Sequence, residues 1–390
     1  MVTGIVCEYN PFHRGHAAML EKVRQSGGDT VVCAMSGNFV QRGEPAIFSK
    51  FARAEMALRG GADLVLELPT PWAMATAETF ARGGVEMLSM AGCDTLAFGS
   101  ERGDADAVER IAQTLLQSEF SAKVKQHLAS GITYALARQR AAEEYLGADA
   151  AILSQPNDIL AVEYAKAVHQ LGADIKLKAI RRIAVAHDGD AAGKYASASY
   201  IRELLRSGES AAAFAYIPEY SAEIIRNEII NGRMVDAKRL ESAILSRLRQ
   251  LPEENFAGYD AGGEGLHHRL YDAVHTAATV EELLEIAKTK RYSMARLRRM
   301  VMAAWLDTPA APQHVPYLRV LAANEKGRAL LGKLRREGKP VLTKPANVDL
   351  LGSEAKALFA AEAGWTDQFL LGMDTPQRPG QDWRYTPLMK

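Results

Sequence analysis

Residues 2–25 read VTGIVCEYNPFHRGHAAMLEKVRQ, and this stretch decides the fold class. It begins with a short apolar run, Val2–Cys7, passes through a turn at Asn10-Pro11, and continues with helical spacing over His16–Gln25. A buried strand followed by a turn and an amphipathic helix is the first half of a βαβ unit. The stretch therefore predicts a parallel sheet whose polar turn residues lie at the carboxyl edge, where α/β proteins bind ligands.

The same alternation continues through the first half of the chain. Apolar runs and segments with helical spacing follow one another at 30–35, 49–59, 64–68, 76–91, 95–98, 157–171, 175–183 and 199–207. This order is typical of a parallel sheet that is covered by helices on both faces. Beyond about residue 206 the strand signals fade and helical segments dominate. We expect a doubly wound α/β domain over 1–205 and a mainly α-helical domain over 206–390.

Length and composition limit the classes of function. The chain has 390 residues, which suffices for two domains, and 48% are hydrophobic, as in an ordinary globular protein. Its three cysteines, Cys7, Cys33 and Cys93, lack CxxC spacing, which argues against disulfides and a cysteine-based zinc site and favours a reducing cytoplasm. We expect no membrane span and no signal peptide, because neither apolar pattern is present.

Charge is segregated along the chain. Lys plus Arg and Asp plus Glu each number 47, so the formal net charge is zero. Residues 288–340 nevertheless hold thirteen Lys and Arg against three Asp and Glu. Such an excess is typical of a face that binds a polyanion, although solvated helix faces produce the same pattern. In a helix from Met294, Arg296 and Arg299 share one face while Arg298 is rotated away.

Two histidines, His13 and His16, stand three residues apart where the first helix should begin. Both imidazoles can reach one phosphate there, and Gly15 between them lets a nucleotide approach the backbone. We expect them to stabilise transition-state charge and not to act as nucleophiles. The alternative is a pair of capping histidines. The glutamate of a zinc-binding HExxH motif is missing, so we expect no protein-bound metal and only Mg²⁺ that accompanies a nucleotide.

The segment MSGNFVQRGEPA, residues 35–46, follows the second strand and faces the same edge. Its small and amide side chains suit a compact polar substrate, and Arg42 and Lys50 are candidates to neutralise a carboxylate or phosphate. The alternative is a glycine-rich surface loop.

Two later segments also end at this edge. Gly99 closes the fourth strand and leaves room for adenine or ribose, unless it is only a turn glycine. Ser197, Ser199 and Arg202 open a later helix, where hydroxyls, backbone N–H groups and a guanidinium can bind phosphate. Helix capping alone is the alternative.

Taken in order, these segments resemble the bacterial tRNA(Met) cytidine acetate ligase family, within the HIGH-type nucleotidyltransferase superfamily. The resemblance spans almost the whole chain and is carried by GIVCEYNPFHRGH (4–16), MSGNFVQRGEPA (35–46), RAEMAL (53–58), FGSE (98–101), PNDILAVEY (156–164), Arg182-Ile183, SASYIR (197–202), EGL (264–266), TKRY (289–292) and VLAANEKG (320–327). The chain departs from the family at Arg14, where a small amide is usual, and around His187.

The resemblance implies an enzyme of two steps. Acetate attacks the α-phosphate of ATP to give acetyl-adenylate, and the wobble cytidine of elongator tRNA(Met) then takes the acetyl group to form N4-acetylcytidine. His13 and His16 would be catalytic. The ATP-binding residues would be Val6, Cys7, Glu8, Tyr9, Asn10, Pro11, Phe12, Gly15, Met19, Gly99, Asn157, Arg181 and Arg182, joined by Ser197, Ser199 and Arg202.

Position selects Ser36, Asn38 and Gln41 for acetate, whereas charge selects Arg42, Lys50 and the tRNA candidates. The acetate candidates are Ser36, Asn38, Gln41, Arg42 and Lys50, and the tRNA candidates are Lys290, Arg291, Arg296 and Arg299. Two other functions stay open on the sequence. One is a nucleotidyltransferase that adenylates a small cofactor precursor, and the other is a non-catalytic RNA-binding protein with a retained nucleotide pocket.

Overall fold

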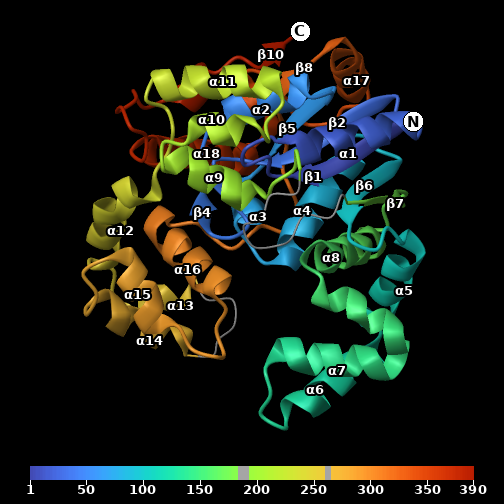
Figure 1. Ribbon diagram of the computed structural model, residues 1–390, viewed down its shortest axis with the longest axis vertical. Coiled ribbons are helices and arrows are strands. Elements are labelled where there is room, and N and C mark those ends of the chain that lie inside the picture. Colours follow the sequence, from blue (N-terminus) through green and yellow to red (C-terminus); the bar gives the residue numbers. More distant parts are fainter. Residues whose placement is uncertain (183–192, 260–264) are drawn as a thin grey trace.

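A computed structural model describes residues 1–182, 193–259 and 265–390 (Figure 1). Its centre is one sheet with the strand order β10-β8-β5-β2-β1-β6-β7, to which β9 adds beside β8. The strands are β1 (Val2–Cys7), β2 (Thr30–Ser36), β5 (Leu64–Leu68), β6 (Thr95–Ser100), β7 (Lys176–Arg181), β8 (Leu318–Ala323), β9 (Val341–Leu342) and β10 (Leu388–Met389). All pairs within it are parallel except β5 with β8.

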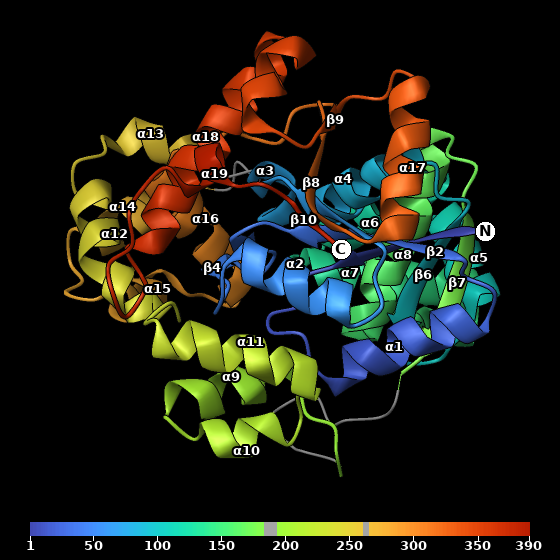
Figure 2. The ribbon, with the colours of Figure 1, turned by 90° about the horizontal axis from the view of Figure 1, so that it is seen from above.

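Both faces of the sheet are buried, because alternate residues of each strand pack into different hydrophobic clusters. On β2, Val31 and Cys33 join one cluster, whereas Val32 and Ala34 join the other. The first face is covered by α1 (Arg14–Gln25), α2 (Lys50–Arg59), α9 (Ala198–Arg206) and α11 (Glu219–Ile230). The second is covered by α4 (Ala77–Met90), α8 (Pro156–Leu171) and α17 (Glu325–Arg336), so the fold is doubly wound (Figure 2).

The strand order reverses beside β1, and this reversal places the site. The chain moves from β1 to β2 and β5 on one side, then returns to β6 and β7 on the other. Residues 8–13, between the end of β1 and the start of α1, therefore lie at a topological switch point, where open α/β sheets bind ligands.

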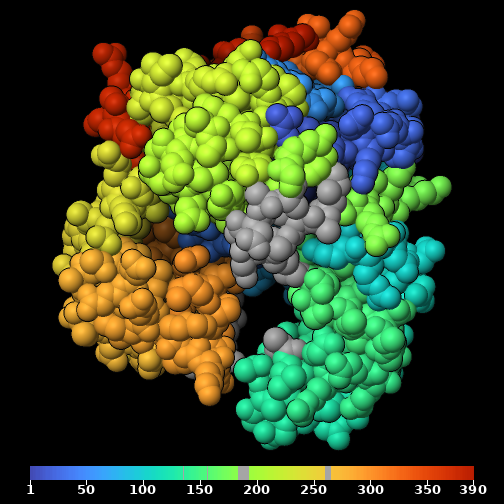
Figure 3. Space-filling view, viewed as in Figure 1, coloured from blue at the N-terminus to red at the C-terminus, as the bar shows by residue number. Residues whose placement is uncertain are grey.

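Most other helices form two groups that leave the sheet on the same side (Figure 1). One group follows β6 and consists of α5 (Ala105–Leu115), α6 (Ser118–Leu128), α7 (Tyr134–Leu146) and the 3₁₀ helix η1 (Gly147–Ser154). The other, here called the helical group, consists of α12 (Glu241–Leu248), α13 (Glu253–Ala257), α14 (Leu266–Val274), α15 (Val280–Ala287) and α16 (Met294–Leu306). Figure 3 shows the surface hollowed between the helical group and the α6–α7 hairpin.

Shorter elements complete the fold. The segment 35–46 forms a small antiparallel ribbon of β3 (Phe39–Val40) and β4 (Glu44–Pro45), and α3 (Thr70–Ala73) follows β5. The remaining elements are α10 (Ser210–Phe214), the 3₁₀ helices η2 (Ala237–Leu240) and η3 (Pro345–Leu351), α18 (Ser353–Leu370) and α19 (Gln381–Arg384).

The second half of the chain contributes more strand than the sequence suggested. We expected helical segments to dominate residues 206–390, but residues Leu318–Ala323, just before α17, form β8, which is antiparallel to β5. Every residue of β8 is buried, so the strand lacks the polar alternation that distinguishes it from a buried helix. The C-terminal part therefore completes the sheet as well as supplying helices, and the division at residue 205 stays a proposal.

Candidate active site

His13 and His16 lie at the N-terminus of α1 with fixed ring orientations. His13 Nδ1 accepts a hydrogen bond of 3.0 Å from the backbone N–H of Gly15, and His16 Nδ1 accepts one of 3.3 Å from the N–H of His13. The rings are stacked with centroids 3.7 Å apart. Because each Nδ1 is an acceptor, each neutral ring carries its proton on Nε2. The pair therefore presents two N–H donors from one helix start.

The surroundings keep both rings neutral. Burial, reinforced by Arg182 and Arg202, lowers the pKa of His13 to about 3. Burial, His13 and Arg182 likewise lower the pKa of His16 well below its ordinary value. At neutral pH both rings are therefore uncharged and each can donate one hydrogen bond through Nε2, while Arg182 and Arg202 supply a positive field around His13.

Aromatic residues of the turn hold the rings in place. Tyr9 and Phe12 are buried, with ring centroids 4.8 and 5.6 Å from that of His16. Asn10 is buried too, and its side chain accepts from the N–H of Ile47. Tyr9, Asn10 and Phe12, all predicted ATP contacts, therefore also pack the switch-point turn.

The other turn residues and their neighbours lie around these rings. Pro11 is buried, whereas Val6, Cys7, Gly15 and Met19 are half-buried at the strand end and the first helical turns.

Beyond β6 and β7, three predicted nucleotide contacts come together. Asn157 accepts a 2.9 Å hydrogen bond from Arg182 Nη1, and a Cβ on Gly99 would lie 3.3 Å from the Arg182 side chain. Asn157 also donates to Glu101, which our site prediction omitted although FGSE was among the matching motifs. Arg181 lies apart from this cluster, with its side chain beside Gly103.

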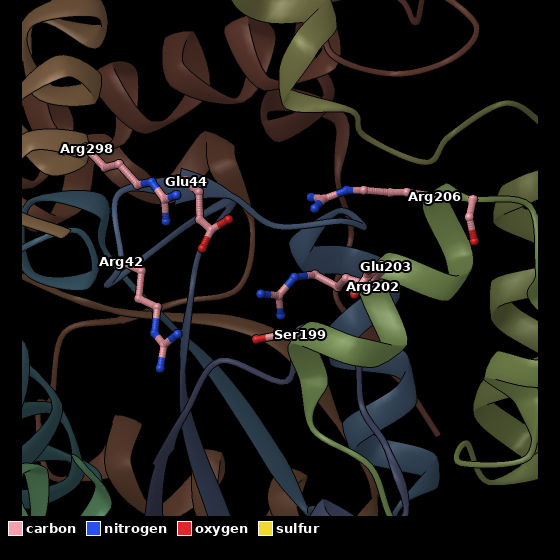
Figure 4. A pocket seen from close by; sticks show the side chains of 8 residues that line it. Arg42, Glu44, Ser199, Arg202, Glu203, Arg206 and Arg298 are labelled. Carbon is pink, nitrogen blue, oxygen red and sulfur yellow. The ribbon is translucent and has the colours of Figure 1, made fainter. Parts of the chain in front are cut away.

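The start of α9 approaches the same turn. Ser197 caps α9 by accepting from the N–H of Tyr200, and Arg202 Nη1 donates a 2.9 Å bond to the carbonyl of Asn10. Ser199 and Arg202 line a pocket of about 470 Å³, together with Arg42, Glu44, Glu203, Arg206, Ser207 and Arg298 (Figure 4). The pocket thus borders the switch-point turn on the side of the helical group.

The predicted acetate residues differ in their surroundings: Ser36, Asn38 and Lys50 are buried, whereas Gln41 and Arg42 are not. The Gln41 N–H donates a 2.8 Å hydrogen bond to Glu8, which joins the segment 35–46 to the end of β1. Ser36 and Asn38 are buried, and Asn38 accepts from the N–H of Lys50 and donates to Thr366.

The expectation that Lys50 neutralises a ligand is corrected by its environment. Its ammonium is fully buried and lies 2.6 Å from Glu67 Oε1 and 2.9 Å from Asp382 Oδ2. Arg319 pairs with the same two carboxylates at 2.9 and 3.0 Å. Lys50 is therefore part of a buried ion cluster that holds the fold together, and Arg42 is the exposed cation of this segment.

Arg53 is a structural residue of the site that our site prediction omitted. It is completely buried, and its guanidinium donates to the carbonyls of Phe48, Glu8, Ser36 and Gly37. These bonds tie the residues after β1 to those after β2. The motif RAEMAL contained Arg53, but its partners lie in segments that only the fold brings together.

The predicted tRNA residues lie on or just before α16. Arg299 is half-buried and donates a 3.3 Å hydrogen bond to the carbonyl of Gln41, while the guanidinium carbon of Arg296 lies 5.2 Å from the Tyr292 ring centroid. Lys290 and Arg291 are exposed in the preceding turn. Arg298, which the helical spacing set aside, is the arginine of α16 that lines the pocket of Figure 4.

The sequence left the roles of Arg14 and His187 open. Arg14 Nε donates to the carbonyl of Ala215, so this arginine fastens α1 to the segment after α10. His187 lies outside the described residues.

Within the described ranges, no group of His, Cys, Asp and Glu side chains is arranged to hold a metal ion. In the same residues, no helix has both the length and the apolar character needed to cross a membrane. All three cysteines are free thiols.

Comparison with known proteins agrees with this geometry. The HIGH Nucleotidyl Transferase family matches residues 1–378, so the class of the protein is that of a HIGH-type nucleotidyltransferase. A tRNA(Met) cytidine acetate ligase of Acetivibrio thermocellus is 38% identical over 356 residues, covering 86% of each chain. One of Fervidobacterium nodosum is 35% identical over 93% of this chain and 89% of that protein. The chain therefore belongs to the tRNA(Met) cytidine acetate ligase family, and it is a ligase.

Solved structures show the same architecture. Thermotoga maritima TmcAL bound with alpha-thio ATP superposes with a TM-score of 0.93 at 29% identity, over 100% of this chain and 99% of that one. The apo form of the same protein superposes with a TM-score of 0.95 at 30% identity, over the same shares. These matches confirm the α/β fold and the family that the motifs indicated.

Proposed function

We propose that this enzyme activates acetate with ATP and transfers the acetyl group to the wobble cytidine of elongator tRNA(Met). An acetate oxygen attacks the α-phosphorus of ATP, a P–O bond forms, and pyrophosphate leaves with the electrons of the broken bond. The N4 amine of the cytidine then attacks the acetyl carbon, AMP departs, and the amine loses a proton. The products are N4-acetylcytidine, AMP and pyrophosphate, and the reaction takes place in the cytoplasm.

The observation that carries the proposal is the histidine pair at the switch point. Two neutral Nε2–H donors on one helix start are suited to the non-bridging oxygens of an α-phosphate, where negative charge grows during the attack. Because the backbone N–H groups fix the rings beforehand, the donors need no reorganisation as the charge develops. Mg²⁺ would accompany ATP, bound mainly through the phosphates.

The nucleotide would lie across the switch point. Gly99, Asn157 and Arg182 bind its adenosine side, while Ser197, Ser199 and Arg202 at the start of α9 bind the phosphates. Ser36, Asn38 and Gln41 lie at or just beyond the end of β2 and are the candidates to position acetate. The C-terminal part, 206–390, holds the tRNA, with Lys290, Arg291, Arg296 and Arg299 among its candidates.

The test is mass spectrometry of nucleosides from tRNA that has been incubated with the enzyme, ATP and labelled acetate. We expect labelled N4-acetylcytidine only when all components are present, together with AMP and pyrophosphate in equal amounts. Pyrophosphate exchange that needs neither acetate nor tRNA, but a small cofactor precursor, would favour the alternative nucleotidyltransferase. Binding of RNA without any ATP turnover would favour a non-catalytic protein.

A further inference from the structure

The pocket of Figure 4 gathers arginines from three separate segments. Arg42 comes from the β3–β4 turn, Arg202 and Arg206 from successive turns of α9, and Arg298 from α16 (Figure 4). Like charges repel at short range, and the two carboxylates that line the same space, Glu44 and Glu203, offset only half of the charge of the four guanidiniums. The pocket is therefore built for a ligand with negative charge.

Three of these guanidiniums are available to a ligand. Arg42, Arg206 and Arg298 are exposed, and across residues 1–182, 193–259 and 265–390 none of them has a hydrogen bond or ion pair. Arg202 differs, because it is half-buried and donates to the carbonyl of Asn10. It links the pocket to the switch-point turn, whereas the other three face solvent.

The balance of charge in the pocket indicates the kind of anion. Glu44 and Glu203 also line it, so four cations face two carboxylates and leave a net charge of two positive. Ser199 and Arg202 are the lining residues proposed for the phosphates of ATP, whereas around the other three arginines the carboxylates of Glu44 and Glu203 oppose a second group as densely charged as a triphosphate. These carboxylates suit a chain of phosphodiesters with one charge each, whose 2′-hydroxyl and base amino groups can donate to carboxylate oxygens.

The location of the pocket agrees with this assignment. It lies between the catalytic edge, which Arg202 contacts through Asn10, and the helical group, which supplies Arg298 from the basic segment 288–340. A macromolecule that rests on the helical group can therefore pass over this pocket as it extends one nucleotide to the histidines. Its volume of about 470 Å³ is enough for a phosphate with its sugar.

We propose that Arg42, Arg206 and Arg298 bind phosphodiester groups of the anticodon loop next to the cytidine that is acetylated. This inference rests on the proposed function and names how the RNA reaches the site. The arginines act through position and charge, since phosphate contacts orient a nucleic acid without reading its sequence. Arg298 and Arg206 thus extend the RNA surface that the sequence placed on Arg296 and Arg299.

The test compares the double variant Arg206→Ala/Arg298→Ala with the wild-type enzyme. Each lost contact to single-stranded RNA removes about 0.7 from the slope of log affinity against log salt concentration, so the double variant should lose roughly 1.4. Its affinity for unmodified tRNA(Met) at low salt should fall at least about tenfold. Arg298→Lys should retain part of the affinity, because lysine keeps the charge but not the planar fork.

The matched control is Arg336→Ala. Arg336 is an exposed arginine of the same basic segment, but it lies on α17, away from the pocket (Figure 1). It should change neither the affinity nor its salt slope by more than about one third of the effect of the double variant.

A second assay separates the two possible sources of phosphate. Acetate-dependent exchange of pyrophosphate into ATP is measured without tRNA, and the double variant should keep the KM for ATP within about twofold. A raised KM for ATP with unchanged tRNA affinity would assign the pocket to the polyphosphate of ATP and overturn the inference. Unchanged values in both assays would also overturn it. Failure of the wild-type enzyme to acetylate tRNA would instead refute the proposed function itself.

Discussion

Two regions position their polar side chains in opposite ways: the sheet edge that carries His13 and His16, here called the edge, and the arginine pocket of Figure 4. At the edge, both histidines accept backbone hydrogen bonds through Nδ1, and the buried Arg53 donates to four carbonyls. In the pocket, the exposed Arg42, Arg206 and Arg298 have no such partner within the described part of the chain. The side chains of the edge are therefore fixed before any ligand arrives. The three exposed guanidiniums of the pocket are positioned only by the backbone of the segments to which they belong.

This difference teaches what each region can recognise. Stabilisation of charge at one phosphorus atom requires donors that are fixed to within a fraction of an ångström. A flexible RNA backbone is better met by exposed guanidiniums that adapt to several phosphate positions. Changes at the edge should therefore produce large losses that salt does not relieve, and changes in the pocket should produce graded losses that depend on salt.

The largest effect is expected from His16→Ala. Loss of one preorganised donor to the α-phosphate should slow acetate-dependent pyrophosphate exchange by at least about 100-fold. The assay needs no tRNA, so it reports on the edge alone, and Arg336→Ala serves as the control that should leave it unchanged. A loss below tenfold would mean that His16 does not contact the reacting phosphate.

The second-largest effect is expected from Arg53→Lys. Lysine cannot reach all the carbonyls that the guanidinium serves, and each buried acceptor left without a donor costs about 1–3 kcal/mol. We expect a loss of about 2–3 kcal/mol in the free energy of unfolding, measured from the denaturant midpoint. An unchanged midpoint would show that the edge is less rigid than its hydrogen bonds indicate.

Salt should distinguish the two regions in the unmodified enzyme. If three pocket arginines contact phosphates, raising the salt concentration from about 50 to 200 mM should weaken tRNA binding by roughly 20-fold through these contacts. The exchange reaction without tRNA should change much less, because its donors are buried and neutral. Equal sensitivity of both reactions would remove the distinction between the regions.

The smallest effect concerns the protonation of the histidines. The lowered pKa of His13, about 3, and that of His16 mean that both rings should stay neutral, with the proton on Nε2, at pH 5.5. Nitrogen-15 NMR of labelled histidine, assigned with His13→Gln and His16→Gln, would show this directly. A ring that titrates near pH 6.5 would contradict it.

The same shift predicts how acid affects stability. Between about pH 3 and the ordinary value of 6.5, the unfolded chain binds a proton at position 13 that the folded chain does not. Stability therefore falls as the pH drops through this interval. Thermal unfolding of the wild type and His13→Gln at pH 7 and pH 5 would measure the contribution, which should be smaller in the variant.

The sequence predicted the local structure around His13 and His16 well, because its determinants lie close together in the chain, whereas the catalytic role of the two histidines stays a proposal. β1 and β5 begin and end at the predicted residues, and His13 and His16 lie at the start of the first helix, as their spacing indicated. Their neighbours in sequence, Tyr9 and Phe12, are also their neighbours in space. Because the strand, the turn and the helix all lie within the first 25 residues, their structure depends little on distant segments.

Features that depend on distant segments could not be predicted in this way. Lys50 follows a helix cap and resembles a ligand residue, but Asp382, 332 positions later, buries and neutralises it. Helical spacing placed Arg296 and Arg299 on one face without showing which face meets the first half of the chain. In the structure, the turn at Gly43 packs directly on α16, because a Cβ there would clash with the backbone nitrogen of Arg299. Arg298 of the same helix lines the pocket.

The buried ion cluster has a consequence for how the chain is made. Lys50 and Arg319 both pair with Asp382, and β10, at residues 388–389, adds the last strand beside β8. During synthesis, Lys50 emerges from the ribosome long before Asp382, so until residue 382 has been made Lys50 has Glu67 but lacks its second carboxylate. The central sheet is thus completed only after residues 388–389 have been synthesised, and a chain that lacks Asp382 leaves Lys50 and Arg319 with a single carboxylate of the cluster, Glu67.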